Sequence, residues 1–348
     1  MAKLRISELE PGMVLQDDIF DESDLLLMSE GTELTAYHID FLRRKRIDEL
    51  NVTLKKQNAV ESEAHRLAAS DVEEKYINTV KKFKSIYTEF KMGRVPVYQE
   101  IDDALEPLYD AILNDEQITR KMWQIHAYDD YTFDHSVRVS MISGLLAKWC
   151  GLDDEKIKEA ALAGLLHDIG KCNIPDNILN KPGALDIEEF KVMKTHAILG
   201  YILIKDLPNV SYDVMLAVMQ HHERVDGSGY PNGIKGNEIS NLAKVIAVAD
   251  VYCAMTQDRV YKVASHPFET MSYMLEKCHK QLDFSISRTF LANISHFYIG
   301  HKVMLSNEQQ GEIIMTYKDD PARPLVRVGD EYYDLRRHMN LEIATMLE

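Results

Sequence analysis

The chain has 348 residues, of which 45% are hydrophobic and 28% charged, so it holds enough apolar material for a full-sized core and a largely disordered protein is excluded. Its formal net charge of -16 disfavours binding to nucleic acid polymers and anionic membranes. A phosphate-bearing substrate would therefore need metal ions or a few placed cations. The sequence carries neither the apolar region of a signal peptide nor a run long enough to span a bilayer, so we expect a cytoplasmic protein.

Short apolar runs alternate with turn signals in residues 1–60, and a helical pattern lies at 36–47, which predicts a small α+β accessory module. Residues 61–125 carry charged and apolar residues at helical spacing on both sides of Pro96, which predicts a linker of two helices. Amphipathic helices bury an apolar stripe against the same chain or a second one. The linker is therefore a candidate homodimer contact.

Helical periodicity dominates residues 126–296, which are predicted to be an all-helical catalytic domain. One apolar face in it is built by Val137, Val139, Ile142, Leu145, Leu146 and Trp149, and Gly151 supplies a stop. Residues 297–348 carry β-branched runs between turn signals, which predicts a small β-rich C-terminal segment. The expected fold class is mainly α.

Side chains that bind metals recur through the helical domain. They are His135, the pair His167 and Asp168, His196, the pair His221 and His222, and Asp250. A lone histidine is more often an ordinary core residue, but adjacent pairs leave many buried polar groups to satisfy, and a metal satisfies several at once. Mixed imidazole and carboxylate ligands suit iron, manganese, zinc, nickel or cobalt, and four cysteines without paired spacing argue against a structural zinc site or disulfides.

Asp168 is the candidate bridging residue, because a carboxylate offers two oxygens to two ions while His167 points to one of them. Lys171 lies four residues beyond His167, and on a helix it would share that face and steady the phosphoryl oxygens or the departing alkoxide. The alternative for Lys171 is a solvated lysine at a helix end. We predict two-metal chemistry with Asp168 and Lys171 as catalytic residues.

The motifs "LLHDIGK", "LNKPG", "HHERVDGSGYP" and "VIAVADVYCAMTQDRVYK", together with His196, resemble the HD-GYP family of bacterial cyclic di-GMP phosphodiesterases. This family is a branch of the HD metal-dependent phosphohydrolases. The likeness covers about residues 126–296 and implies an HD-type helical domain there. The motifs in this order are specific, whereas an isolated His-Asp pair is not.

The resemblance implies two divalent metals, iron first and manganese as the alternative. One would be bound by His135, His167, Asp168 and Asp250, and the second would share Asp168 and take His196, His221 and His222. It implies phosphate contacts from Lys171, Arg259 and Lys262, and a pocket wall made by Gly229, Tyr230 and Pro231. A solvated helix end is the alternative for Arg259 and Lys262, and bidentate phosphate capture favours Arg259 more than Lys262.

Some family members bind a third metal through a glutamate one helical turn before the first histidine ligand. Here that position is Tyr131, which cannot take the same role at neutral pH, and its alternative role is packing. Asp129 and Asp130 are near, but a shift of one or two residues turns a helical side chain away. We therefore expect two metals.

The resemblance implies hydrolysis of cyclic di-GMP through a hydroxide that bridges the metals, with linear pGpG as the first product and either pGpG or GMP as the last. Another cyclic dinucleotide, such as cyclic GMP-AMP, is the alternative substrate, because the ligands leave the base unspecified. A catalytically silent module that binds cyclic di-GMP and signals through protein partners is the other alternative. A site without catalytic activity would be free to lose its buried ligands, so the intact ligand set disfavours the silent module.

Overall fold

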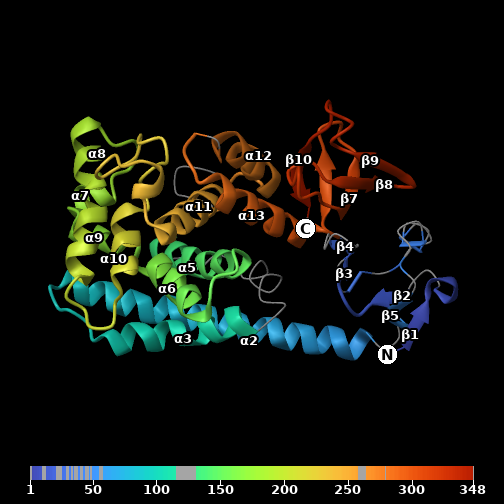
Figure 1. Ribbon diagram of the computed structural model, residues 1–348, viewed down its shortest axis with the longest axis horizontal. Coiled ribbons are helices and arrows are strands. Elements are labelled where there is room, and N and C mark those ends of the chain that lie inside the picture. The colour runs from blue at the N-terminus through green and yellow to red at the C-terminus, as the bar shows by residue number, and fades with distance from the viewer. Residues whose placement is uncertain are drawn as a thin grey trace. The chain divides into compact units, whose positions relative to one another are not determined.

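The structure is a computed structural model. It describes residues 2–9, 13–20, 26–28, 31–32, 34, 38–39, 42–43, 47, 49–54, 58–114, 131–257, 264–278 and 280–347. The chain forms two compact units, one made of Met1–Ser70 with Ile294–Glu348 and one made of Asp71–Asn293 (Figure 1). The finer division into four segments stays a prediction.

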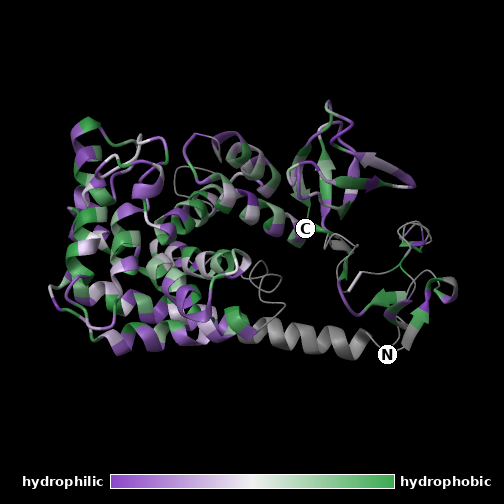
Figure 2. Ribbon diagram, in the orientation of Figure 1, coloured by the Kyte–Doolittle hydropathy of each residue, from purple (hydrophilic) through white to green (hydrophobic). Residues whose placement is uncertain are grey.

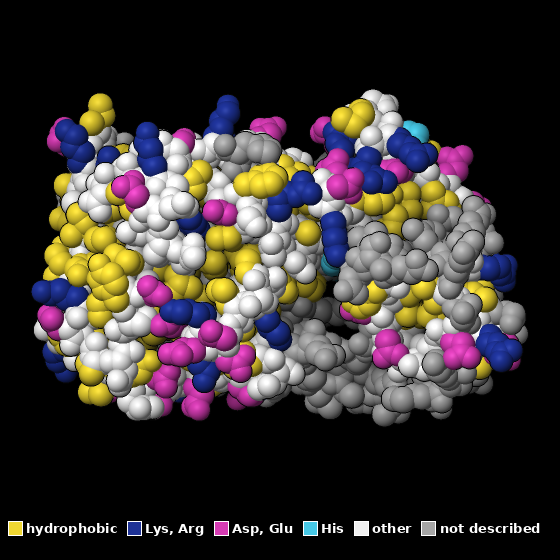
Figure 3. All heavy atoms as spheres, in the orientation of Figure 1, with side chains coloured by type: hydrophobic (Ala, Val, Ile, Leu, Met, Phe, Trp, Pro, Cys, Tyr) yellow, Lys and Arg dark blue, Asp and Glu magenta, His cyan; other side chains and the backbone are white. Residues whose placement is uncertain are grey.

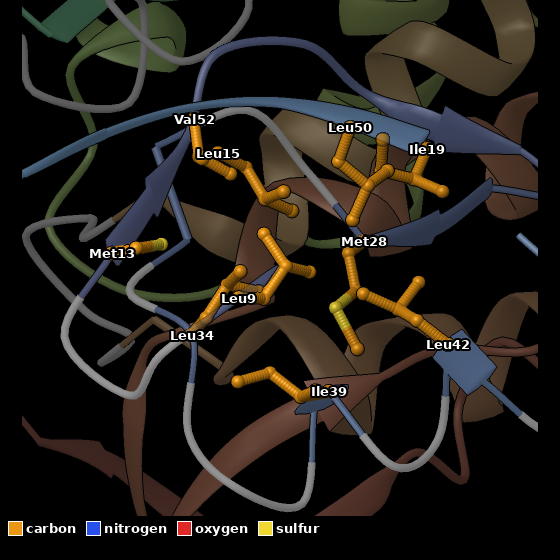
Figure 4. Packing of buried hydrophobic residues seen from close by; sticks show 10 residues of the cluster. All are labelled: Leu9, Met13, Leu15, Ile19, Met28, Leu34, Ile39, Leu42, Leu50 and Val52. Carbon is orange, nitrogen blue, oxygen red and sulfur yellow. The ribbon is translucent and has the colours of Figure 1, made fainter. Parts of the chain in front are cut away.

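The N-terminal residues form a three-stranded antiparallel sheet and a two-stranded one. The first has the order β1 (Ala2–Arg5), β5 (Glu49–Leu54), β2 (Met13–Leu15), and the second pairs β3 (Ile19–Phe20) with β4 (Leu26–Met28), while a short 3-10 helix η1 (Ile6–Glu8) follows β1. Figure 4 shows the small core, made of Leu9, Met13, Leu15, Ile19, Met28, Leu34, Ile39, Leu42, Leu50 and Val52. Within the helix predicted at 36–47, the described residues His38, Ile39, Leu42 and Arg43 are helical, and Ile47 is not.

The C-terminal residues form a five-stranded antiparallel sheet, as the alternating β-branched pattern predicts. Its order is β10 (Ile343–Leu347), β6 (Lys302–Leu305), β7 (Gln310–Met315), β8 (Leu325–Val328), β9 (Glu331–Asp334). Ile314, Tyr317 and Leu325 form a small core beside it.

Two helices, α2 (Asn58–Lys91) and α3 (Tyr98–Asn114), stand on either side of Pro96, where the sequence predicts the break. Both carry hydrophilic and hydrophobic residues (Figure 2), and α3 packs its buried stripe against α5 and α6 of the same chain. The opposite face of α3 exposes acidic side chains (Figure 3), namely Glu100, Asp103, Glu106 and Asp110. Among the described helices, none has the length and apolar character needed to cross a membrane.

Three helices form the centre of the second unit: α5 (Tyr131–Trp149), α6 (Asp154–Leu166) and α11 (Asn241–Thr256). The helices α5 and α6 pack along each other, and α11 packs on both. A Cβ on Gly164 of α6 would lie 2.8 Å from the Cα of Ser140, so glycine permits this close approach. The Asp153 carboxylate caps α6 by accepting the Lys156 backbone N–H at 2.9 Å.

Shorter elements surround this centre. They are η2 (Ile169–Asn173), α7 (Asp176–Leu179), α8 (Ile187–Lys194), α9 (His196–Ile204), α10 (Tyr212–Gln220), η3 (Gly236–Glu238), α12 (Pro267–Cys278) and α13 (Phe284–Ile294), whereas η4 (Ser295–Tyr298) belongs to the first unit. Contacts of α9 with η2 and α10, and of α10 with α6 and α11, join them to the centre. Three predicted ligands lie at the ends of these elements: Asp168 precedes η2, His196 begins α9 and His221 follows α10.

Candidate metal centre

The structure brings all seven predicted ligands into two groups. The first ligand group is His135, His167 and Asp250, and the second ligand group is Asp168, His196, His221 and His222. Within each group, one candidate ligand atom per residue lies within 4.8 Å of the others. All seven residues are buried except His222, which is half-buried.

The Asp168 carboxylate lies between the two groups. Its Oδ2 atom is 3.2 Å from Nε2 of His167, and its Oδ1 atom is 3.3 Å from Nε2 of His196. One oxygen therefore faces each group, which is the placement that a bridging carboxylate needs.

Three histidines are oriented by their own local backbone. The Nδ1 atoms of His167, His196 and His221 each lie 2.7 Å from a carbonyl oxygen three residues earlier, on Gly164, Met193 and Val218 respectively. A carbonyl only accepts, so each Nδ1 carries the proton and each Nε2 keeps its lone pair. This is the tautomer in which Nε2 can bind a metal.

Several polar atoms here lack a conventional partner. Nε2 of His196 faces Nε2 of His221 at 3.3 Å, although both carry lone pairs in the tautomer just described. Nε2 of His167 and Oδ1 of Asp168 are buried without a hydrogen bond to any described residue. Each unsatisfied buried group costs about 1–3 kcal/mol. Divalent cations would satisfy all four atoms at once, so these residues fit a metal centre.

Burial lowers the pKa of His222 to about 3. Burial and the neighbouring His222 hold the pKa of His221 well below its ordinary value, and burial also lowers the pKa of His196. The histidines of the second ligand group are therefore neutral at pH 7, as metal ligands must be. Burial opposes a charge on His167 too, but the Asp168 carboxylate outweighs it and raises the pKa of this histidine.

The two carboxylates are held ionised. Burial alone would raise the pKa of Asp168, but the Lys171 ammonium and His167 hold it well below the usual range. Burial likewise opposes the charge on Asp250, but the neighbouring His135 and His167 keep its pKa well below the usual range.

The predicted position of Lys171 on the same helical face as His167 is wrong. The α-helix ends at Leu166, and Asp168 leaves the helical conformation with φ -101° and ψ 7°, so Lys171 lies in the 3-10 helix η2. Its ammonium contacts Asp168 Oδ2 at 2.5 Å with a side chain that is 26% exposed. Lys171 is therefore not a freely solvated lysine, and it does not share a helical face with His167.

The Gly-Tyr-Pro turn folds back onto the histidine pair. The Tyr230 N–H donates to the carbonyl of His222 at 3.2 Å, and the two rings lie 4.6 Å apart. A Cβ on Gly229 would lie 2.4 Å from the His222 carbonyl oxygen, so only glycine fits. The cis Tyr230–Pro231 peptide closes the turn. Tyr230 is thus placed beside the second ligand group.

Other residues support the centre without having been predicted from the sequence. Buried Glu223 accepts the backbone N–H groups of Asn232 at 2.7 Å and Gly233 at 3.1 Å, and so holds the turn. Its place inside "HHERVDGSGYP" was the available signal. The Lys194 ammonium lies 5.8 Å from the Tyr230 ring, which puts a cation near the centre.

Some predicted residues lie outside the described part of the chain. They are Arg259, Lys262, Asp129 and Asp130, and the side chain of Tyr131, which begins α5. Their roles stay predictions. Cys150, Cys172 and Cys253 are free thiols, as expected, and the side chain of Cys278 is not described.

Residues 121–286 match the model of the HD domain family. The cyclic di-GMP phosphodiesterase PA4108 of Pseudomonas aeruginosa is 34% identical over 244 residues, which are 70% of this chain and 59% of that protein. The 3'3'-cGAMP-specific phosphodiesterase 1 of Vibrio cholerae is 35% identical over 175 residues, 50% of this chain and 40% of that protein. The HD-GYP type recognised from the motifs is confirmed by these matches.

The chain thus spans less than two thirds of the length of these relatives. Among solved structures, Bd1817, an HDG"Y"P protein from Bdellovibrio bacteriovorus, matches with a TM-score of 0.53 at 17% identity, covering 83% of this chain and 97% of that chain. This likeness bears on the fold alone. The prediction of a mainly α protein with an HD-type helical domain is confirmed.

Proposed function

We propose that this protein is a metal-dependent phosphodiesterase that opens cyclic di-GMP to linear pGpG and cleaves it onward to GMP. The observation that carries the proposal is Asp168, with one oxygen directed at each ligand group. The name of the Pseudomonas relative supports cyclic di-GMP as the substrate.

Two divalent ions, when bound, supply a water activated for attack at neutral pH and positive charge for the phosphoryl oxygens. The first ligand group would hold one ion and the second ligand group the other, with Asp168 shared. The nitrogen and oxygen donors suit iron, which we propose first, with manganese as the alternative.

The protein would use its own cations to hold the substrate phosphates. Lys171 reaches the centre through Asp168, and Lys194 stands over the ring of Tyr230. A cyclic dinucleotide carries two phosphates and two flat bases, so an aromatic ring beside a cation suits it. We propose Arg259 and Lys262 as further phosphate contacts, and Gly229, Tyr230 and Pro231 as the pocket wall.

Cyclic GMP-AMP is the second candidate substrate, since the name of the Vibrio relative specifies 3'3'-cGAMP. The metal ligands act on the phosphate and not on the base, so they favour neither dinucleotide. The silent binding module remains the alternative of a different class. The homodimer contact through 61–125, signalling protein partners, the absence of a third metal and a cytoplasmic location stay predictions.

The test is hydrolysis of cyclic di-GMP by protein loaded anaerobically with iron or manganese, with metal content measured on the same sample and products separated over time. We expect pGpG to appear before GMP, with about two metals per chain. Faster cleavage of cyclic GMP-AMP under the same conditions would assign that substrate instead. Tight binding of either dinucleotide without turnover in any metal would identify a silent module.

Lys171→Met should lower kcat by about a hundredfold while leaving the metal content near two, because a cation that stabilises phosphoryl charge is lost but no ligand is. Metal analysis and steady-state kinetics on one preparation check this. Lys191→Met is the matched control, since Lys191 is 61% exposed and paired with Glu188. An unchanged kcat in Lys171→Met would reduce Lys171 to an ion-pair partner of Asp168.

A further inference from the structure

A chain of polar groups leads from α2 to the first ligand group. The Tyr76 hydroxyl of α2 donates to Asp134 Oδ1 at 2.7 Å, and the Gln257 amide nitrogen donates to Asp134 Oδ2 at 2.8 Å. Oε1 of the same Gln257 lies 2.9 Å from Nδ1 of His135, whose Nε2 lies 3.1 Å from Asp250 Oδ1. We call Tyr76, Asp134 and Gln257 the relay.

The relay sets the tautomer of His135. The Asp134 carboxylate accepts from the Tyr76 hydroxyl and the Arg138 guanidinium, and it also takes the NH2 group of Gln257, which turns the Gln257 carbonyl toward His135. The carbonyl accepts from Nδ1–H, which leaves the lone pair of His135 on Nε2, toward Asp250. An amide that flipped end for end would present NH2 to Nδ1 and favour the opposite tautomer.

His135 differs in this respect from three other candidate ligands. His167, His196 and His221 bond to carbonyls three residues earlier in their own segments, so their orientation is local. Nδ1 of His135 instead contacts a side chain 122 residues away, which is oriented in turn by contacts from α5 and α2. Among the described contacts of the second ligand group, no histidine Nδ1 is hydrogen-bonded to a side chain from a distant segment.

The contact of α2 with α5 is well packed. Tyr76 is 1% exposed and Asp134 is 2% exposed, and the Arg138 guanidinium donates to Asp134 at 2.9 Å. On the same side of α5, Phe133 meets the ring of Tyr87 with centroids 5.1 Å apart. The compact helical unit begins at Asp71, so α2 is also the segment by which the chain enters it.

We propose that Tyr76 is a positioning residue, acting through Asp134 and Gln257 on His135, so that the docking of α2 strengthens metal binding by the first ligand group. The inference rests on the proposed function, since it takes His135 as a ligand. By thermodynamic linkage, metal binding in the first ligand group then strengthens the docking of α2 by the same factor. Groups that hydrogen-bond to a metal-bound histidine typically change the metal affinity by about 10–100-fold.

The experiment measures manganese binding to the full chain, in competition with a chelator of known affinity. Tyr76→Phe keeps the ring and removes the hydroxyl, and Asp134→Asn allows the Gln257 amide to flip. We expect the wild type to bind two manganese ions, and each variant to bind one of them about 10–100-fold more weakly while the other affinity is unchanged. Tyr109→Phe is the control, because its hydroxyl donates instead to the Lys158 carbonyl of α6 at 2.9 Å.

Amide hydrogen exchange gives a readout that a purely structural role would not move. Addition of manganese should slow exchange in residues 72–91 of the wild type and of Tyr109→Phe, but not of Tyr76→Phe. Gln257→Leu serves as a further variant if Asp134→Asn does not fold.

The outcomes separate the two proposals. Two manganese sites in the wild type with unchanged affinities in Tyr76→Phe and Gln257→Leu would overturn the relay alone. Equal weakening of both sites would also overturn it, because the effect would then not be specific to His135. A wild type that binds no manganese or iron would overturn the proposed function, and the positioning role with it.

Discussion

Replacing Asp168 with alanine is expected to empty both ligand groups and to lower hydrolysis by more than about a thousandfold. The reason is geometric, because each oxygen of this carboxylate faces a different histidine, at 3.2 and 3.3 Å. Its removal also leaves the Lys171 ammonium without its counter-charge. Metal content per chain and the initial rate, measured on the same purified protein, test the prediction.

Asp206→Ala is the matched control for this change. Asp206 is also an aspartate close to a lysine, but its side chain is 85% exposed and its ion pair with Lys205 spans 3.7 Å. Exposed pairs of this kind contribute at most about 1 kcal/mol, so activity and metal content should stay at wild-type levels. An Asp168→Ala protein that retained two metals would remove Asp168 from the bridging position.

Gly170→Ala is expected to destabilise the helical unit by about 3 kcal/mol or more and to lower the metal affinity of the second ligand group. A Cβ at this position would lie 2.0 Å from the His196 carbonyl oxygen and 2.4 Å from the Gly200 nitrogen. Both neighbours are backbone atoms of α9, so the helix that begins with the ligand His196 would have to move. Urea unfolding measures the loss of stability, and metal titration of the folded fraction measures the loss of affinity.

Gly144→Ala provides the comparison within the same unit. Its new Cβ would lie 2.9 Å from Cδ1 of Ile112, which is the end of a side chain that can change rotamer. We expect a loss below about 1.5 kcal/mol and no change in metal affinity. Equal destabilisation by both substitutions would show that the approach of η2 to α9 is not what Gly170 permits.

The metal ligands could be predicted because four of the seven occur as two pairs of adjacent residues in the sequence. His167 with Asp168, and His221 with His222, stand at helix ends, where one pair of adjacent residues can direct two side chains at one point. The predicted helical position of Lys171 was wrong for a local reason. A turn at Asp168 interrupts the helix that the four-residue spacing of His167 and Lys171 suggested. Four-residue spacing predicts a shared face only while the α-helix continues.

Gln257, Asp134 and Tyr76 could not have been found in this way. Tyr76 lies 58 residues before Asp134, and Gln257 lies 122 residues after His135. Tyrosine, aspartate and glutamine at such separations have ordinary surface or core roles in most chains. Their connection exists only because α2, α5 and the end of α11 meet.

By itself, the sequence determined the helical character of residues 131–257, the small sheets at both ends of the chain and the identity of the candidate ligands. These features depend on periodicity, turn residues and side-chain chemistry, which are local properties of the chain. The tertiary structure decided that Asp168 turns one oxygen to each ligand group. It also decided that Nδ1 of His135 contacts a distant side chain, whereas Nδ1 of His167, His196 and His221 contacts a local carbonyl. Those features depend on how helices pack, because hydrogen bonds between segments form only where burial has brought their donors and acceptors together.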